Sequence, residues 1–115
     1  MKYTIAIIDD EEGVRKSIAA VLATYGFETV SYSSARGFLE SESGRNAACA
    51  LMDIRMPEMD GLQAFQAMRE EGIATPVIFI TGHADIRLAV KCVKAGAAES
   101  RAGLLCYHLD PTVPA

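Results

Sequence analysis

Two apolar runs in this chain each end directly in aspartate. Residues 5–8 lead into Asp9 and Asp10, and residues 48–52 lead into Asp53. Each run has the character of a buried strand. Aspartate is a poor strand residue, and burying it without a partner is costly. The pattern therefore predicts two buried strands that carry acidic side chains at their carboxyl ends.

The remaining patterns alternate between strand and helix. Strands are expected at residues 3–8, 27–32, 48–53 and 76–81. Helices are expected at residues 14–25, in a short segment capped by Ser34, from Asp60 to near Gly72, and at residues 85–95, with a turn at residues 43–46. This alternation is typical of an α/β protein with a doubly wound parallel sheet, where ligands bind beyond the carboxyl ends of the strands.

Length and composition indicate one small domain. The chain has 115 residues and a formal net charge of -4, which argues against nonspecific binding of nucleic acid. No apolar stretch is long enough to span a bilayer and no signal peptide opens the chain, so we expect a cytoplasmic protein without a membrane partner. The three cysteines match neither a disulfide framework nor a zinc pattern.

In a parallel sheet the aspartates that end neighbouring strands would meet at one edge. Carboxylates that lie close together repel one another unless a cation or a proton lies between them. Oxygen ligands of this kind suit Mg²⁺, which takes few protein carboxylates and keeps several waters. The residues thus predict a Mg²⁺ site at Asp9, Asp10 and Asp53. A simpler role for the first two, capping the following helix, remains open but leaves Asp53 unexplained.

Four landmarks in the chain together resemble one family. They are IDDE at residues 8–11, MDIRMPEMDG at residues 52–61, ITGH at residues 80–83 and KAGA at residues 94–97. Their order and spacing resemble the receiver domain of two-component response regulators, and the second and third are similar to receivers of the FixJ type. The resemblance implies a flavodoxin-like receiver fold, a sensor histidine kinase as partner, and control of a transcriptional output domain that this chain is expected to lack.

The resemblance also implies a role for each site residue. Asp53 would accept a phosphoryl group from a phosphohistidine of the kinase. Asp10 and Asp53 would bind the Mg²⁺ cofactor directly and Asp9 through water, while the backbone carbonyl of Arg55 would supply a further ligand. Thr81 would act as the switch residue by donating its hydroxyl to a phosphoryl oxygen after transfer. An ordinary role in the strand remains the alternative for Thr81.

The last part of the chain departs from the receiver pattern. Gly103 stands where a receiver carries a lysine after its fifth strand, and no lysine follows Lys94. We therefore expect a receiver domain at residues 1–99 and an atypical tail at residues 100–115, from a reading-frame change or an artificial end, with natural divergence as the alternative. The fifth strand and fifth helix should be missing or replaced, and residues 104–109 could form a strand outside the usual register.

Such a defect would leave the fourth strand as an open edge of the sheet. Unpaired backbone groups at an edge invite pairing with another chain, so we expect a homodimer, either swapped or packed through the exposed face.

Two other functions stay open at this point. One is a non-phosphorylated, dimerising interaction module. The other is an aspartyl-phosphate hydrolase of the haloacid dehalogenase type, which would need an Asp-x-Asp arrangement, whereas Asp9 and Asp10 are adjacent. We therefore expect a signalling domain rather than an enzyme, with no direct contact to nucleic acid.

Overall fold

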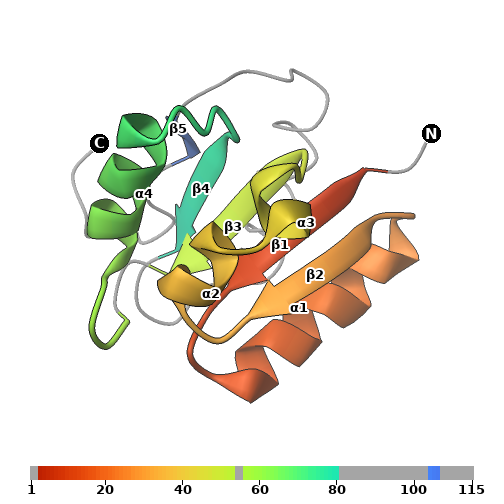
Figure 1. The fold of residues 1–115 in the computed structure, drawn as a ribbon. Helices are drawn as coiled ribbons and strands as arrows, with labels where there is room; N and C mark the ends of the chain where they lie inside the picture. Colours follow the sequence, from red (N-terminus) through yellow and green to blue (C-terminus); the bar gives the residue numbers. More distant parts are fainter. Residues whose placement is uncertain (1–2, 54–55, 81–103, 107–115) are drawn as a thin grey trace.

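The computed structural model describes residues 3–53, 56–80 and 104–106, the last three by their backbone. Their strands form one parallel sheet in the order β2-β1-β3-β4-β5 (Figure 1). The strands are β1 (Thr4–Ile8), β2 (Glu28–Tyr32), β3 (Cys49–Asp53), β4 (Val77–Ile80) and β5 (Leu104–Cys106). The helices of the described part are α1 (Glu12–Thr24), α2 (Ala35–Leu39), α3 (Glu42–Arg45) and α4 (Gly61–Glu70). The predicted α/β class with a parallel sheet is confirmed.

Each face of the sheet packs against its own helices. Ile18 of α1 lies in one buried cluster with Ile7 and Leu51, which project from β1 and β3. Phe38 of α2 and Met68 of α4 lie in a second cluster against the opposite face. Figure 1 shows α1 on one side of the sheet and α2 and α4 on the other. Because both faces are covered, the central strands β1, β3 and β4 are largely apolar, whereas β2 at the edge of the sheet carries the exposed Glu28 and Ser31. The acidic side chains Asp9 and Asp53 appear where β1 and β3 end.

The predicted helix boundaries have local causes in the structure. Gly26 ends the α1 region with a φ of 87°, a backbone conformation that glycine adopts without strain. The Ser34 Oγ atom accepts a hydrogen bond from the Gly37 backbone N–H at 3.1 Å and so caps α2. Asp60 and Gln63 form a reciprocal capping box at the start of α4, with bonds of 2.8 and 2.9 Å.

The turn expected at residues 43–46 is wrong, because Glu42–Arg45 forms the short helix α3. The Ser41 Oγ atom accepts a hydrogen bond from the Gly44 backbone N–H at 3.2 Å and lies 2.6 Å from the Tyr32 hydroxyl oxygen. These contacts connect the single helical turn to the end of β2. A helix of one turn has too little periodicity to be told from a turn by sequence pattern.

The strand β5 pairs in parallel with β4, through Val77 with Leu104 and through Ile78 with Cys106. The register shifts between these two pairs. The expected fifth strand is therefore replaced rather than missing. The alternative that residues 104–109 form a strand outside the usual register is supported for Leu104–Cys106, so β4 is not left fully open. The helix expected at residues 85–95 and any fifth helix lie outside the described residues.

Close packing around α3 gives a stability prediction. A Cβ atom added at Gly44 would lie 2.8 Å from Phe38 Cδ1 and 2.9 Å from the Tyr32 hydroxyl oxygen, so both rings would have to move. Gly44→Ala should therefore lower the free energy of unfolding by about 1–3 kcal/mol. The control is Gly13→Ala in α1, where an added Cβ has nothing within 4 Å and should leave stability unchanged or raised. Urea unfolding measures both; equal stability of the two variants would contradict the packing argument.

Candidate metal and phosphoacceptor site

Three acidic side chains converge at the carboxyl ends of β1 and β3. The register pairs Ile8 with Met52, so the next residue along each strand, Asp9 or Asp53, lies beside the other. One carboxylate oxygen from each of Asp9, Asp10 and Asp53 lies within 4.8 Å of the other two. Asp9 is buried, Asp53 is half-buried and Asp10 is exposed. The structure thus brings together the three carboxylates that the sequence pattern assigned to one edge of the sheet.

Asp9 is held by hydrogen bonds from three directions. Its backbone N–H donates to the Tyr32 carbonyl oxygen at 3.1 Å, which continues the pairing of β1 with β2. Its Oδ1 atom accepts from the Glu11 backbone N–H at 2.9 Å. Its backbone carbonyl accepts from the Arg15 guanidinium at 2.7 Å. The capping alternative is not met, because the N-cap of α1 is Glu11 and this end of the helix has no side-chain cap hydrogen bond. The Asp9 carboxylate binds the N–H of the N-cap residue itself and has capacity for further bonds.

The position of Asp9 makes its negative charge costly. Burial raises the pKa of the Asp9 carboxyl, and the neighbouring Asp10 and Glu11 charges add to the rise. The hydrogen bond from the Glu11 backbone N–H and the charge of Arg15 oppose it. A cation within reach of all three carboxylates would favour the ionised form. Because the donors are carboxylate oxygens at the ends of rigid strands, the cluster fits a hard divalent cation such as Mg²⁺.

The buried charge predicts a pH-dependent effect of Asp9→Asn. Asparagine keeps an oxygen for the Glu11 N–H and removes the charge, so the metal-free melting temperature should rise by several degrees at neutral pH. Because the folded-state pKa of Asp9 is raised, its favourable contribution is present below the unfolded-state pKa and lost as the pH rises through the folded-state value. The advantage of the variant should therefore shrink as the pH falls toward about 4. Thermal unfolding in a chelator measures it, and an advantage that is largest in acid would contradict the argument.

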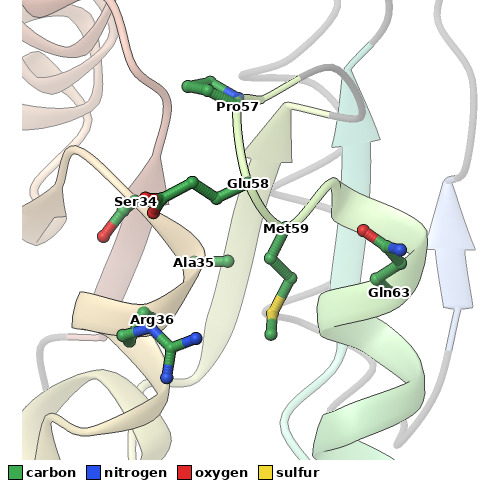
Figure 2. Close-up of a pocket in the computed structure, with 7 residues that line it drawn as sticks. All are labelled: Ser34, Ala35, Arg36, Pro57, Glu58, Met59 and Gln63. Atoms are coloured by element: carbon green, nitrogen blue, oxygen red, sulfur yellow. The ribbon is translucent and has the colours of Figure 1, made fainter.

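The loop after β3 leads from the acidic cluster to α4. Glu58 has a φ of 70°, in the left-handed region that residues other than glycine rarely adopt. The Met59 backbone N–H donates to the Pro57 carbonyl at 2.8 Å, which tightens the turn. Together with α2 the loop lines a groove of about 220 Å³ (Figure 2). Figure 2 shows the Glu58 side chain extending across the groove toward Ser34. The groove is separate from the acidic cluster, since none of the three aspartates lines it.

Two of the predicted site residues are outside the described part of the chain. They are Arg55 and Thr81, whose roles remain predictions. The sequence reasoning in turn missed Arg15, which contacts the backbone of Asp9. A weak sequence feature could have indicated this contact. Arg15 lies near the start of a predicted helix, where side chains tilt toward the N-terminus and so toward the segment just before the helix.

Comparison with known proteins identifies the family. The sequence pattern of the response regulator receiver domain matches residues 5–100 of this chain. The chain belongs to this receiver-domain family. The receiver domain is 39% identical over 95 residues to the response regulator protein TodT of Pseudomonas putida, a match that covers 83% of this chain and 42% of TodT. It is 40% identical over 97 residues to the transcriptional regulatory protein FixJ of Rhizobium meliloti, covering 84% of this chain and 48% of FixJ.

Solved structures agree with this assignment. The crystal structure of FixJ-N matches the receiver domain with a TM-score of 0.66 at 32% identity, over 97% of this chain and 86% of that chain.

Receiver domains of two-component systems interact with histidine kinases and generally bind Mg²⁺ at an acidic pocket. The chain spans about half of the length of the curated relatives described above, or slightly less. Within the described ranges, every helix is too short or too polar to cross a membrane.

Proposed function

We propose that this receiver domain accepts a phosphoryl group on Asp53 from a histidine kinase. The observation that carries the proposal is the convergence of three carboxylates within 4.8 Å at the ends of two adjacent parallel strands. Parallel α/β sheets bind ligands at this edge. A lone strand-end aspartate would not need two acidic neighbours, whereas a nucleophile that works beside a divalent cation does.

In the transfer, a carboxylate oxygen of Asp53 attacks the phosphorus atom of the phosphohistidine. The phosphorus–nitrogen bond breaks, and its electron pair stays on the imidazole nitrogen. The other ring nitrogen of the phosphohistidine carries a proton before transfer, so the products are an aspartyl phosphate at the end of β3 and a neutral histidine on the kinase. Asp53 is half-buried, so its carboxylate combines a fixed position on the strand with access from outside.

The acidic residues around Asp53 would hold Mg²⁺, which supplies compensation for the charge on the phosphoryl oxygens and a template for in-line attack. Asp10 and Asp53 would bind the ion directly and Asp9 through water, with the backbone carbonyl of Arg55 as a further ligand. The gradient of exposure from Asp9 to Asp10 supports this division, because the exposed carboxylate is the one that an incoming hydrated ion meets first.

The output of the domain is part of the same proposal. Thr81 would donate its hydroxyl to the phosphoryl group and so transmit phosphorylation to a transcriptional output domain. The domain would then act in the cytoplasm as a signalling module rather than as an enzyme. The homodimer also remains a prediction. Fewer unpaired backbone groups now favour it, because β5 already pairs with Val77 and Ile78 of β4. Light scattering distinguishes a monomer from a dimer.

A small phosphodonor tests the proposal without the cognate kinase. The full chain, incubated with acetyl phosphate and Mg²⁺, should gain one phosphoryl group in its intact mass. Chelation of Mg²⁺ before the donor is added should abolish the gain, because the three carboxylates then repel the incoming phosphoryl oxygens. No gain in mass with Mg²⁺ present would favour the interaction module. Turnover of a phosphate ester in excess over the protein would favour the hydrolase.

A further inference from the structure

The positively charged side chain of Arg15, near the start of α1, contacts the acidic edge of the sheet. Arg15 begins its backbone bonding in α1 by donating its N–H to the Glu11 carbonyl at 3.1 Å. Side chains in a helix tilt toward its N-terminus, so the Arg15 side chain points back along the segment that carries Asp9 and Asp10. Its guanidinium donates to the Asp9 backbone carbonyl at 2.7 Å.

The carbonyl of Asp9 belongs to the peptide group that joins Asp9 to Asp10. Fixing this peptide fixes the direction in which the chain leaves β1, and therefore the place from which the Asp10 side chain starts. The N–H of Asp9 is fixed separately by β2, through Tyr32, at 3.1 Å. Arg15 thus supplies the constraint on the side of Asp9 that faces Asp10.

The target of the Arg15 bond also matters for the metal site. A guanidinium can bind a carboxylate with two bonds, which would occupy the ligand atoms. Here the hydrogen bond goes to a carbonyl oxygen, and the carboxylates of Asp9 and Asp10 keep their capacity for a cation.

We propose that Arg15 is a positioning residue for the metal site, holding the Asp9–Asp10 peptide so that both carboxylates converge with Asp53. The inference rests on the proposed function, because the ligand that the convergence serves is Mg²⁺. It predicts that removal of Arg15 weakens Mg²⁺ binding. A cation that acted only through its charge would have the opposite effect, because its removal would lower the repulsion of Mg²⁺.

The test is calorimetric titration of the full chain with Mg²⁺. Arg15→Met, which keeps the length of the stem but has no donor, should raise the Kd for Mg²⁺ about tenfold, because loss of a group that orients metal ligands costs about ten- to a hundredfold in metal affinity. Arg15→Lys keeps a donor and should recover most of the affinity. The increase should persist in about 0.5 M KCl, where effects of charge alone are screened.

The matched control is Lys16→Met, on the same helix turn. Lys16 is exposed and pairs with Glu12 at 3.2 Å, so the variant removes the same charge without touching Asp9. Its Kd should stay within about twofold of the parent, because exposed charges are screened.

Three outcomes would overturn the inference. They are an Arg15→Met chain that binds Mg²⁺ as tightly as the parent or more tightly, a loss that disappears in high salt, and an equal loss in Lys16→Met. If the parent itself binds no Mg²⁺, the proposed function falls together with the inference.

A second measurement needs no variant. The Arg15 side-chain N–H signals of the parent should be protected from solvent exchange both with and without Mg²⁺, because the bond to the Asp9 carbonyl is present in both states. Loss of protection when Mg²⁺ is added would show that the ion displaces Arg15, which would contradict a positioning role.

Discussion

The Asp53→Asn chain is expected to gain no phosphoryl group from acetyl phosphate under conditions that label the parent. Asparagine has almost the same shape and keeps one oxygen, so β3 and its pairing with β1 and β4 should survive. The amide oxygen is a much poorer nucleophile than a carboxylate oxygen, and the nitrogen cannot form the acyl phosphate. The labelling rate should fall more than a hundredfold, which corresponds to an activation barrier raised by more than about 2.7 kcal/mol.

A nearby carboxylate provides the control for this variant. Glu58→Gln removes a negative charge from the loop after β3 but leaves the acidic cluster intact, since Glu58 lines the separate groove (Figure 2). It should be labelled at a rate close to that of the parent. Labelling of Asp53→Asn at the parent's rate would refute the assignment of the phosphoacceptor.

Asp10→Asn is expected to weaken Mg²⁺ binding by more than about a hundredfold. Substitutions of groups that only support metal ligands cost about ten- to a hundredfold, so loss of a directly binding carboxylate should cost at least as much. Metal-free stability should not fall, because removing one of three close carboxylates lowers their mutual repulsion. The gain should be smaller than that of Asp9→Asn, because Asp10 is exposed and its charge is screened by water.

Calorimetric titration with Mg²⁺ and thermal unfolding in a chelator measure the two parts. The control is Glu12→Gln, an exposed carboxylate in the first turn of α1, which should leave the Mg²⁺ affinity nearly unchanged. An Asp10→Asn chain that melts well below the parent without metal would count against a crowded acidic cluster.

The parts of the fold that could be predicted from sequence have repeated or strongly local signals. The apolar runs before Asp9 and Asp53 are buried on both sheet faces. A strand that is buried on both faces is a continuous apolar run, which can be recognised in the sequence alone. Gly26 and Asp60 end and begin helices through local geometry that neighbouring residues alone determine. The carboxylate cluster followed from these elements, because parallel strands end at the same edge.

The parts that could not be predicted depend on contacts between distant segments. The turn at α3 becomes a helix partly through the contact of Ser41 with Tyr32, which no local pattern contains. The position of β5 is set by pairing with β4 across a shifted register, and a short apolar run can pair in more than one register. Arg15 matters through a bond to a backbone carbonyl, which places no demand on the identity of the residue that it contacts.

The central claim is that Asp53 is the residue that carries the phosphoryl group, and borohydride reduction tests it most directly. An aspartyl phosphate is an acyl phosphate, which borohydride reduces to homoserine, whereas an unmodified aspartate is unchanged. After the full chain is labelled with acetyl phosphate and Mg²⁺ and then reduced, peptide mass mapping should find homoserine at position 53 and unmodified aspartate at positions 9 and 10. Homoserine at another position, or none in a chain that has gained a phosphoryl group, would contradict the account.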